Sequence, residues 1–150
     1  SIIKGVFTSA KSIAKSIDLE KYSINAEGWI NVNERGTLHK PHIHANSSFS
    51  GVFYVKVPKA ESSNGVANEI VHKDPAGSIE FLDPRNSLRA YSKGIEELGS
   101  SLAFTDRITM PPREGRLIVF PAWLKHWVYP VEVNDDRISI SFNTWFVRED

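Results

Sequence analysis

The chain begins with a helical pattern of apolar side chains. Between residues 1 and 20 the apolar positions recur every three or four residues, at Ile3, Val6, Phe7, Ala10, Ile13, Ala14 and Ile17. The positions between them are mostly lysine and serine, which favour solvent. This spacing predicts one amphipathic helix over about residues 1–20, packed on the outside of the rest of the domain. The alternative is that this helix binds a partner.

From residue 28 onward the pattern changes to short runs of β-branched and aromatic residues separated by turn residues. Strands are expected over residues 29–33, 42–44, 50–57, 78–82, 107–110, 116–120, 126–129 and 137–146. Eight short strands with one packing helix predict an all-β barrel or jelly roll with helical support, in a single domain over residues 1–150 whose roll covers about 28–147. Two longer polar segments, 59–77 and 84–106, are expected to be loops over the mouth of the roll, the second with a helical turn near 95–98.

Composition narrows the class of protein. The 150 residues are 41% hydrophobic and 24% charged, which is ordinary for a globular domain. Eighteen basic and 18 acidic residues balance, so neither a nucleic acid nor an anionic membrane is expected as a partner. The absence of cysteine excludes disulfides, zinc ribbons, iron–sulfur clusters and thiol catalysis. No apolar run reaches the roughly 20 residues of a membrane span and no signal peptide is visible, so a cytoplasmic location is expected.

Histidines provide the clearest candidates for chemistry. His42 and His44 are two residues apart on a segment expected to be extended, so their side chains should point to the same face. Two adjacent imidazoles form half of a transition-metal site, and His126 is the best candidate for the other half. The remaining two, His39 and His72, are expected to be exposed on a turn and in a polar loop.

The last predicted strand separates polar from apolar positions. Its polar face carries Arg137, Ser139, Ser141 and Asn143, and its apolar face carries Ile138, Ile140 and Phe142. In one interpretation the polar face meets solvent and the apolar face meets the core. In the other, Arg137 and Ser139 line a cavity inside the roll and hold a carboxylate by charge-assisted hydrogen bonds. The sequence leaves both open.

Taken in order, these segments resemble the iron(II)- and 2-oxoglutarate-dependent oxygenases, and in particular a small group from bacteria and their phages that is related to prolyl hydroxylases. The resemblance runs from about Trp29 to Asn143. Its landmarks are residues 29–33, 42–44, 50–54, 81–85 and 115–121, His126, and residues 137–143. Each landmark is weak alone, and their order and spacing together are fairly specific.

The resemblance implies a double-stranded β-helix with iron(II) near one mouth, held by His42, His44 and His126. The family motif has an acid where this chain has His44, so the three ligands would be neutral and would leave more positive charge on the metal. Two alternatives stay open: the ligand pair is shifted to His44 and Asn46, or Asp83 supplies a carboxylate. Zinc or nickel could occupy the same three ligands.

The resemblance also implies that Arg137, Ser139 and Tyr54 hold the distal carboxylate of 2-oxoglutarate. The implied reaction uses O2 to convert 2-oxoglutarate to succinate and CO2 while a substrate is oxidised, usually hydroxylated, and no residue beyond the metal centre is given a catalytic role. Residues expected to line the pocket are Asn31, Asn33 and Trp127.

Two other functions compete with this dioxygenase hypothesis. One is a cupin-like metalloenzyme with a three-histidine site and no 2-oxoglutarate, although the Gly-rich cupin motifs are not found. The other is a non-catalytic β-roll binding protein. The sequence does not separate a small-molecule substrate from a peptide or protein substrate, and an edge strand or the N-terminal helix could pair two copies in a homodimer.

Overall fold

The computed structural model describes residues 2–13, 18, 21–58, 76–85 and 107–149. Within these residues the chain forms one helix, α1 (Ile2–Ile13). It also forms the strands β1 (Tyr22–Asn33), β2 (His39–His42), β3 (Phe49–Lys56), β4 (Ile79–Leu82), β5 (Arg107–Met110), β6 (Leu117–Pro121), β7 (His126–Val128) and β8 (Arg137–Arg148). The expected loops over 59–77 and 84–106 lie largely outside the described residues, as does the helical turn near 95–98.

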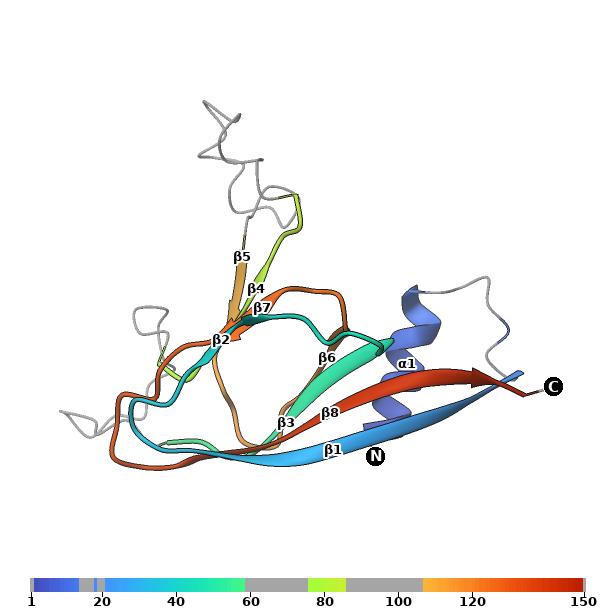
Figure 1. Ribbon diagram of the computed structural model, residues 1–150. Helices are drawn as coiled ribbons and strands as arrows, with labels where there is room; N and C mark the ends of the chain where they lie inside the picture. The colour runs from blue at the N-terminus through green and yellow to red at the C-terminus, as the bar shows by residue number, and fades with distance from the viewer. Residues whose placement is uncertain (1, 14–17, 19–20, 59–75, 86–106, 150) are drawn as a thin grey trace.

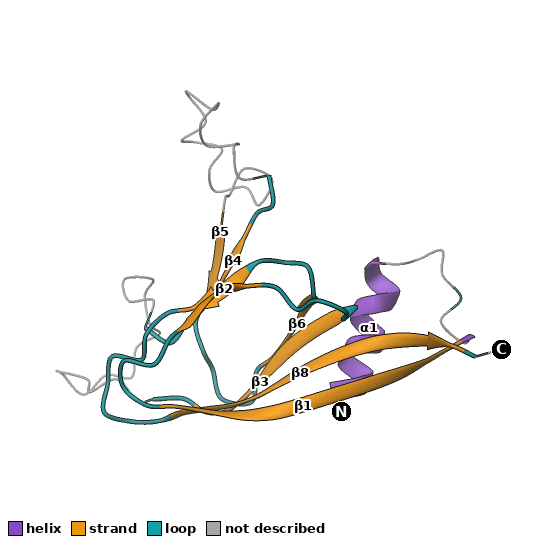
Figure 2. Cartoon of the chain, in the orientation of Figure 1, coloured by secondary structure: helices purple, strands orange, loops and turns teal. Residues whose placement is uncertain are grey.

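The strands form two four-stranded antiparallel sheets. One has the order β1-β8-β3-β6 and the other the order β2-β7-β4-β5. The first sheet is long and the second is shorter, standing over one end of the first, with α1 toward the other end (Figures 1 and 2). This two-sheet antiparallel arrangement is a double-stranded β-helix, or jelly roll, and confirms the predicted fold class.

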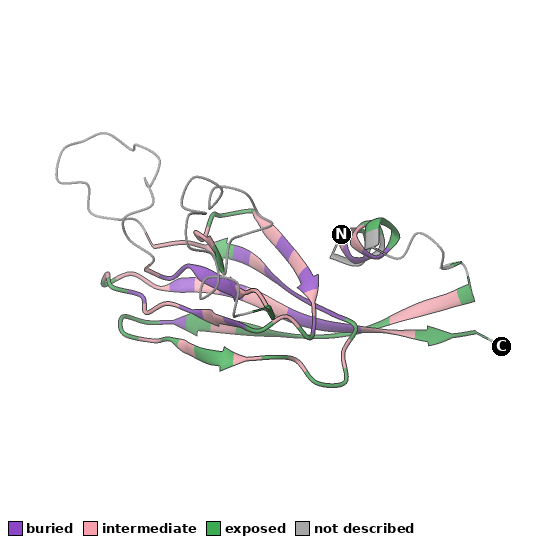
Figure 3. Cartoon of the chain, turned by 90° about the horizontal axis from the view of Figure 1, so that it is seen from above, coloured by how far each residue is buried: buried purple, intermediate pink, exposed green. Residues whose placement is uncertain are grey.

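The core lies between the two sheets. It is formed by side chains from the inner faces of β3, β4, β6 and β7: Val52, Tyr54, Ile79, Phe81, Ile118, Phe120 and Val128. The central strands β3 and β8 are largely buried, whereas β1, at the edge of the long sheet, is mainly exposed (Figure 3). The roll is therefore held together along its central strands.

The helix packs on the outer face of the long sheet, as its amphipathic pattern predicts. Val6 and Ala10 are buried there against Phe49 and Phe142, which belong to the faces of β3 and β8 opposite the core. The helix ends at Ile13, earlier than expected, and residues 14–17, 19 and 20 lie outside the described part of the chain. It is too short to cross a membrane.

The first strand begins seven residues earlier than the expected start at residue 29. β1 pairs with β8 without interruption, from Tyr22 opposite Arg148 to Asn33 opposite Arg137. The segment 25–28 contains residues with low strand preference, so its own sequence does not predict a strand. Pairing with the long β8 decides its conformation instead.

Gly51 allows β3 and β8 to pack closely. It lies opposite Phe142 in the ladder, and a Cβ at this position would collide with the Phe142 ring and lie 2.6 Å from the carbonyl oxygen of Ile118. The backbone oxygen cannot move without breaking sheet pairing. Glycine is therefore required at this position by close approach rather than by a turn.

We expect Gly51→Ala to lower the free energy of unfolding by about 1–3 kcal/mol, because overpacking forces the side chains and backbone apart. Urea denaturation monitored by tryptophan fluorescence would measure this. Gly28→Ala is the matched control, since its Cβ would lie 3.3 Å from the Ser141 carbonyl oxygen on an exposed edge strand. Equal losses in the two variants would contradict the packing argument.

Candidate metal centre

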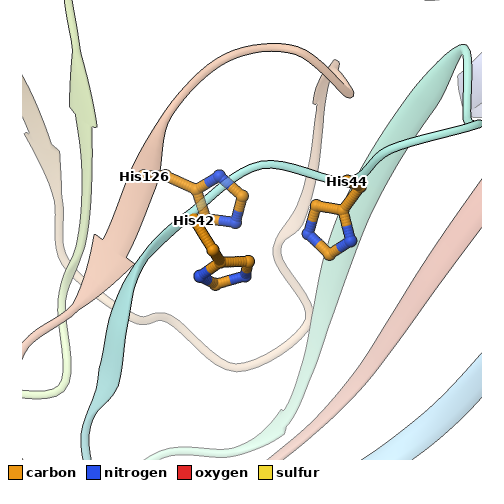
Figure 4. A group of neighbouring side chains, drawn as sticks. All are labelled: His42, His44 and His126. Atoms are coloured by element: carbon orange, nitrogen blue, oxygen red, sulfur yellow. The ribbon is translucent and has the colours of Figure 1, made fainter.

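Three imidazoles meet at the end of the shorter sheet. His42 is the last residue of β2 and His126 the first of β7, and the two lie opposite each other in the ladder. The ring centroids are 4.4 Å apart for His42 and His126, 5.1 Å for His42 and His44, and 5.2 Å for His44 and His126. One ring nitrogen from each lies within 4.8 Å of the others, and the rings surround one space (Figure 4). An ion bonded at about 2.1 Å to each nitrogen would hold the nitrogens roughly 3–3.4 Å apart, so the rings would have to close by a small movement around it.

His44 reaches this group from outside the strand. β2 ends at His42, so the expected extended segment over residues 42–44 is not continuous. The backbone N–H of His44 donates to the carbonyl of Ala122 at 2.9 Å, and Asn46 then takes a left-handed conformation with a φ of 62°. The backbone bond to the segment between β6 and β7 therefore places His44 beside His126.

Backbone carbonyls set the tautomers of two of the rings. His42 Nδ1 lies 2.6 Å from the Lys40 carbonyl oxygen, and His126 Nδ1 lies 2.9 Å from that of Leu124. A carbonyl can only accept, so each Nδ1 carries the proton and donates it. Each neutral ring then keeps a lone pair on Nε2. This is the arrangement in which outer hydrogen bonds orient metal-binding histidines.

Burial favours the neutral form of His44 and His126. It lowers the pKa of His126 to about 4, against a smaller opposing effect of the Leu124 carbonyl, and the neighbouring imidazoles lower that pKa further. Burial is also the main cause of the lowered pKa of His44, with His42 contributing. Neutral imidazole is the form that binds a metal ion, so the site is prepared for one at neutral pH.

A cavity extends from the three imidazoles into the roll. It is lined by Trp29, Asn31, His39, His42, His44, Gly51, Val52, Ile79, Phe120, His126, Val128, Arg137, Ser139 and Ser141. The lining is therefore histidine at one side, apolar along the core strands, and polar along β8. The polar face of β8 points inward, which resolves the question that its alternating pattern left open.

The polar end of the cavity has buried hydrogen-bonding groups without partners: Arg137 and Ser139 line the cavity, whereas Tyr54 lies behind the lining, against Arg137. Arg137, Ser139 and Tyr54 are at most 2% exposed, and the guanidinium carbon of Arg137 lies 4.9 Å from the centre of the Tyr54 ring. The Tyr54 hydroxyl, the Ser139 hydroxyl and Arg137 Nε have no hydrogen-bond partner among the described residues. Burial raises the pKa of Tyr54, although the charge of Arg137 opposes this shift, so its hydroxyl stays protonated.

Such unpartnered groups are costly unless a ligand satisfies them. The three together can donate several hydrogen bonds, and one of them carries a positive charge. In the part of the chain that the structure describes, no carboxylate forms an ion pair with Arg137. The donor set therefore fits the carboxylate of a ligand.

The expected pocket residues have different outcomes. Asn31 lines the cavity and donates to the Ser141 hydroxyl at 2.8 Å, while Asn33 lies behind the lining and accepts from Arg137 at 2.9 Å. Trp127 does not line the cavity, contrary to expectation. Side chains alternate along β7, so His126 points inward and Trp127 points outward, where its ring lies 5.9 Å from that of Tyr129.

Two further residues of the lining come from β1 and β2. Trp29, from the edge strand β1, lines the cavity with its ring 6.3 Å from that of His44. His39 also lines it, rather than lying exposed on a turn. A strict two-residue alternation would put His39 and His42 on opposite faces. The β2–β7 ladder shifts register between these two residues, which allows both to face the cavity.

The two alternative ligands lie elsewhere. Asp83 does not line the cavity: its carboxylate pairs with the guanidinium of Arg85, at 2.9 Å from Nε, and this partner holds the Asp83 pKa at about 2. The Asp83 carboxylate is therefore held by a local ion pair, away from the imidazoles. Asn46 is exposed and does not line the cavity either. His44 remains the third candidate ligand beside His42 and His126.

Comparison with known proteins identifies a family. The sequence profile of the family described as "Putative 2OG-Fe(II) oxygenase" matches residues 27–143. A search of curated proteins finds no matching sequence.

Solved structures share the fold. A prolyl-4-hydroxylase from Pseudomonas putida has a TM-score of 0.55 at 14% identity, covering 99% of this chain and 63% of that one. SnoN, a non-heme alpha ketoglutarate dependent epimerase from nogalamycin biosynthesis, has a TM-score of 0.55 at 15% identity, with coverage of 93% and 52%. HygX from Streptomyces hygroscopicus, with nickel and 2-oxoglutarate bound, has a TM-score of 0.51 at 9% identity, with coverage of 93% and 62%. The chain thus spans less than two thirds of the length of each.

We expect His126→Ala to weaken binding of a divalent metal by more than about 100-fold, because even groups that only orient a metal ligand contribute 10–100-fold. Anaerobic calorimetric titration with iron(II), and separately with nickel(II), would measure the dissociation constants. His72→Ala is the matched control, since the sequence places His72 in a polar loop. If His126→Ala bound both metals as tightly as wild type, the proposed metal centre would be wrong.

A second substitution tests His44. His44→Asp restores the acid of the family motif, and an anionic oxygen ligand should raise the affinity for iron(II) relative to wild type. The same calorimetric titration measures the change. If His44→Asp left the affinity for both metals unchanged, His44 would not be a ligand.

Proposed function

The chain belongs to the 2OG-Fe(II) oxygenase family, and from this premise we propose that it is an iron(II)- and 2-oxoglutarate-dependent dioxygenase that oxidises, and most simply hydroxylates, its substrate. One observation carries the proposal. Three imidazoles and a buried guanidinium, which has no acidic partner among the described residues, line the same cavity inside a double-stranded β-helix.

His42, His44 and His126 would hold the metal. Their neighbouring ring nitrogens, the tautomers set by the Lys40 and Leu124 carbonyls, and the lowered pKa values of His44 and His126 all fit this role. When bound, iron(II) with 2-oxoglutarate and O2 supplies the oxidising chemistry, with succinate and CO2 as co-products. The contribution of the protein is to place and shield these groups.

Arg137, Ser139 and Tyr54 would hold the distal carboxylate of 2-oxoglutarate. A guanidinium and two hydroxyls can together donate to both carboxylate oxygens, and charge-assisted hydrogen bonds are about twice as strong as neutral ones. In the ligand-free protein these donors lack partners, so binding removes an existing cost as well as forming new bonds. Fixing the far end of the cosubstrate also orients its near end toward the imidazoles.

The walls between these two ends are apolar. Val52, Ile79, Phe120 and Val128 line the cavity along the core strands. They limit the access of water, and in a low-dielectric site the attraction between Arg137 and a carboxylate is stronger than in solvent. The same walls protect the reaction from solvent.

The substrate would enter the cavity beside Trp29. Trp29 lines the cavity near His44 and is 40% exposed, so its indole borders the approach from solvent. A flat or apolar part of a small molecule, or a side chain of a peptide, could pack on it. We therefore propose Trp29 as the substrate-side wall, opposite the end that takes 2-oxoglutarate.

A three-histidine metalloenzyme that uses no 2-oxoglutarate is the second candidate. The observation that favours it is the all-imidazole group, which lacks the acid of the family motif. This second function does not explain why Arg137 is buried, or why the hydroxyls of Tyr54 and Ser139 have no hydrogen-bond partner among the described residues. The dioxygenase proposal accounts for both ends of the cavity.

We expect Arg137→Met to weaken 2-oxoglutarate binding by about 30-fold or more, because loss of one partner of a buried charge pair costs 2–5 kcal/mol. The measurement is an anaerobic titration of the iron(II)-loaded protein with 2-oxoglutarate, followed by the visible charge-transfer band. Iron(II) affinity should be unchanged. Arg113→Met, at an exposed position, is the matched control. If wild type bound no 2-oxoglutarate with metal present, the proposed function would be wrong.

Tyr54→Phe and Ser139→Ala should separate binding from stability. Each removes a buried hydroxyl that has no partner in the ligand-free protein, so the free energy of unfolding should stay the same or rise. The 2-oxoglutarate dissociation constant should rise by about 10-fold, since hydrogen bonds to a charged group contribute 1.5–3 kcal/mol. Chemical denaturation and the same titration would measure the two effects. A variant that lost stability but kept full affinity would contradict this role.

A further inference from the structure

The guanidinium of Arg137 is one end of a chain of three side chains. Arg137 Nη1 donates to Asn33 Oδ1 at 2.9 Å, and Asn33 Nδ2 lies 3.1 Å from His39 Nε2. Asn33 is the last residue of β1, opposite Arg137 at the start of β8, and His39 is the first residue of β2. Three strands from both sheets are therefore tied together behind the cavity.

The chemistry of the groups fixes the direction of each bond. A guanidinium can only donate, so Asn33 must present its oxygen to Arg137. Its amide nitrogen, which can also only donate, then faces His39, and the ring nitrogen Nε2 must accept. His39 is consequently neutral with its proton on Nδ1. Reversing the amide would point its NH2 group at the guanidinium, which also only donates, so the amide has one allowed orientation.

The type of acceptor is informative. Arg137 is 2% exposed and Asn33 is 4% exposed, yet Arg137 forms no ion pair with a carboxylate among the residues that the structure describes. An aspartate at position 33 could accept the same hydrogen bond and neutralise the guanidinium. The amide oxygen anchors Nη1 and leaves the positive charge uncompensated, with Nε still without a partner.

We propose that Asn33 and His39 are positioning residues for the cosubstrate. The amide holds the Arg137 guanidinium in place without neutralising it, and the His39 imidazole holds the amide, so that the full charge stays available to the distal carboxylate of 2-oxoglutarate. This inference rests on the proposed function. It gives roles to a residue expected only to line the pocket and to a histidine expected to be exposed.

Asn33→Asp separates this role from a merely structural one. If the chain only satisfies the hydrogen bonds of a buried arginine, an aspartate serves equally well or better, because it accepts from the guanidinium and adds a counter-charge. If the chain keeps the charge free, the aspartate competes with the ligand carboxylate. Stability and 2-oxoglutarate affinity should then change in opposite directions.

The experiment uses the full chain loaded with iron(II) under anaerobic conditions and titrated with 2-oxoglutarate. We expect Asn33→Asp to bind 2-oxoglutarate at least about 10-fold more weakly, from repulsion between two carboxylates at one guanidinium. Its thermal midpoint should equal or exceed that of wild type, and its iron(II) affinity should be retained. Asn25→Asp is the matched control, because it makes the same change at an exposed position of the same strand.

His39 provides a second, independent comparison. His39→Leu removes the acceptor for the Asn33 amide and should weaken 2-oxoglutarate binding, whereas His39→Gln provides a side-chain oxygen that can accept again and should restore part of the affinity. Iron(II) binding should be the same in both variants. If the imidazole had only a structural role, His39→Gln would bind 2-oxoglutarate no better than His39→Leu.

The outcomes separate the two proposals. Wild type that binds iron(II) but no 2-oxoglutarate overturns the proposed function and this inference with it. Wild type that binds 2-oxoglutarate, with Asn33→Asp binding it equally well, overturns the inference alone. Should Asn33→Asp fail to fold, equal cosubstrate affinity in His39→Leu, His39→Gln and wild type overturns the inference.

Discussion

Burial of the Arg137 guanidinium, with no acidic partner in the described part of the chain, is the constraint on which the rest of the site depends. Removing a charge from water is costly unless hydrogen bonds and an opposite charge replace the solvent. The protein supplies part of this replacement, through the Asn33 amide and the face of the Tyr54 ring. The remainder, a counter-charge and a partner for Nε, is what a bound carboxylate would add. The cavity is therefore built for an anion before any ligand is present.

The jelly roll brings this cationic end and the imidazole group into one chamber. β8 belongs to the long sheet and carries Arg137, while β2 and β7 belong to the short sheet and carry His42 and His126. The chain passes repeatedly from one sheet to the other, so residues remote in sequence face each other across a core only two side chains thick. His44, placed by its backbone bond to Ala122, completes the group. Each end of the chamber is thus supported by a different sheet.

The charge balance of the chamber gives the histidine at position 44 a physical meaning. The family motif has an acid there, which would offset part of the charge of a metal ion. In this chain position 44 carries an imidazole instead, and burial depresses the pKa of His44 and His126, which favours their neutral form. Arg137 adds a further positive charge that the described residues leave unpaired. A dianion such as 2-oxoglutarate is complementary to such a chamber at both of its ends.

Local pattern in the sequence determined most of the strands, apart from the first half of β1, and the residue types that carry the chemistry. Alternation and turn residues predicted the roll, and the spacing of His42 and His44 predicted two neighbouring imidazoles, because both depend on short-range periodicity. The grouping of these two with the distant His126 rested on the family resemblance. The sequence of β8 alone does not decide the direction of its polar face. An alternating strand can turn that face to solvent or to a cavity equally well. Pairing with β1, the core of the roll and the covering helix placed Arg137 inside. The register shift in β2 that allows His39 to face the cavity exists only in the ladder with β7, so tertiary structure alone decided that His39, through Asn33, supports the guanidinium.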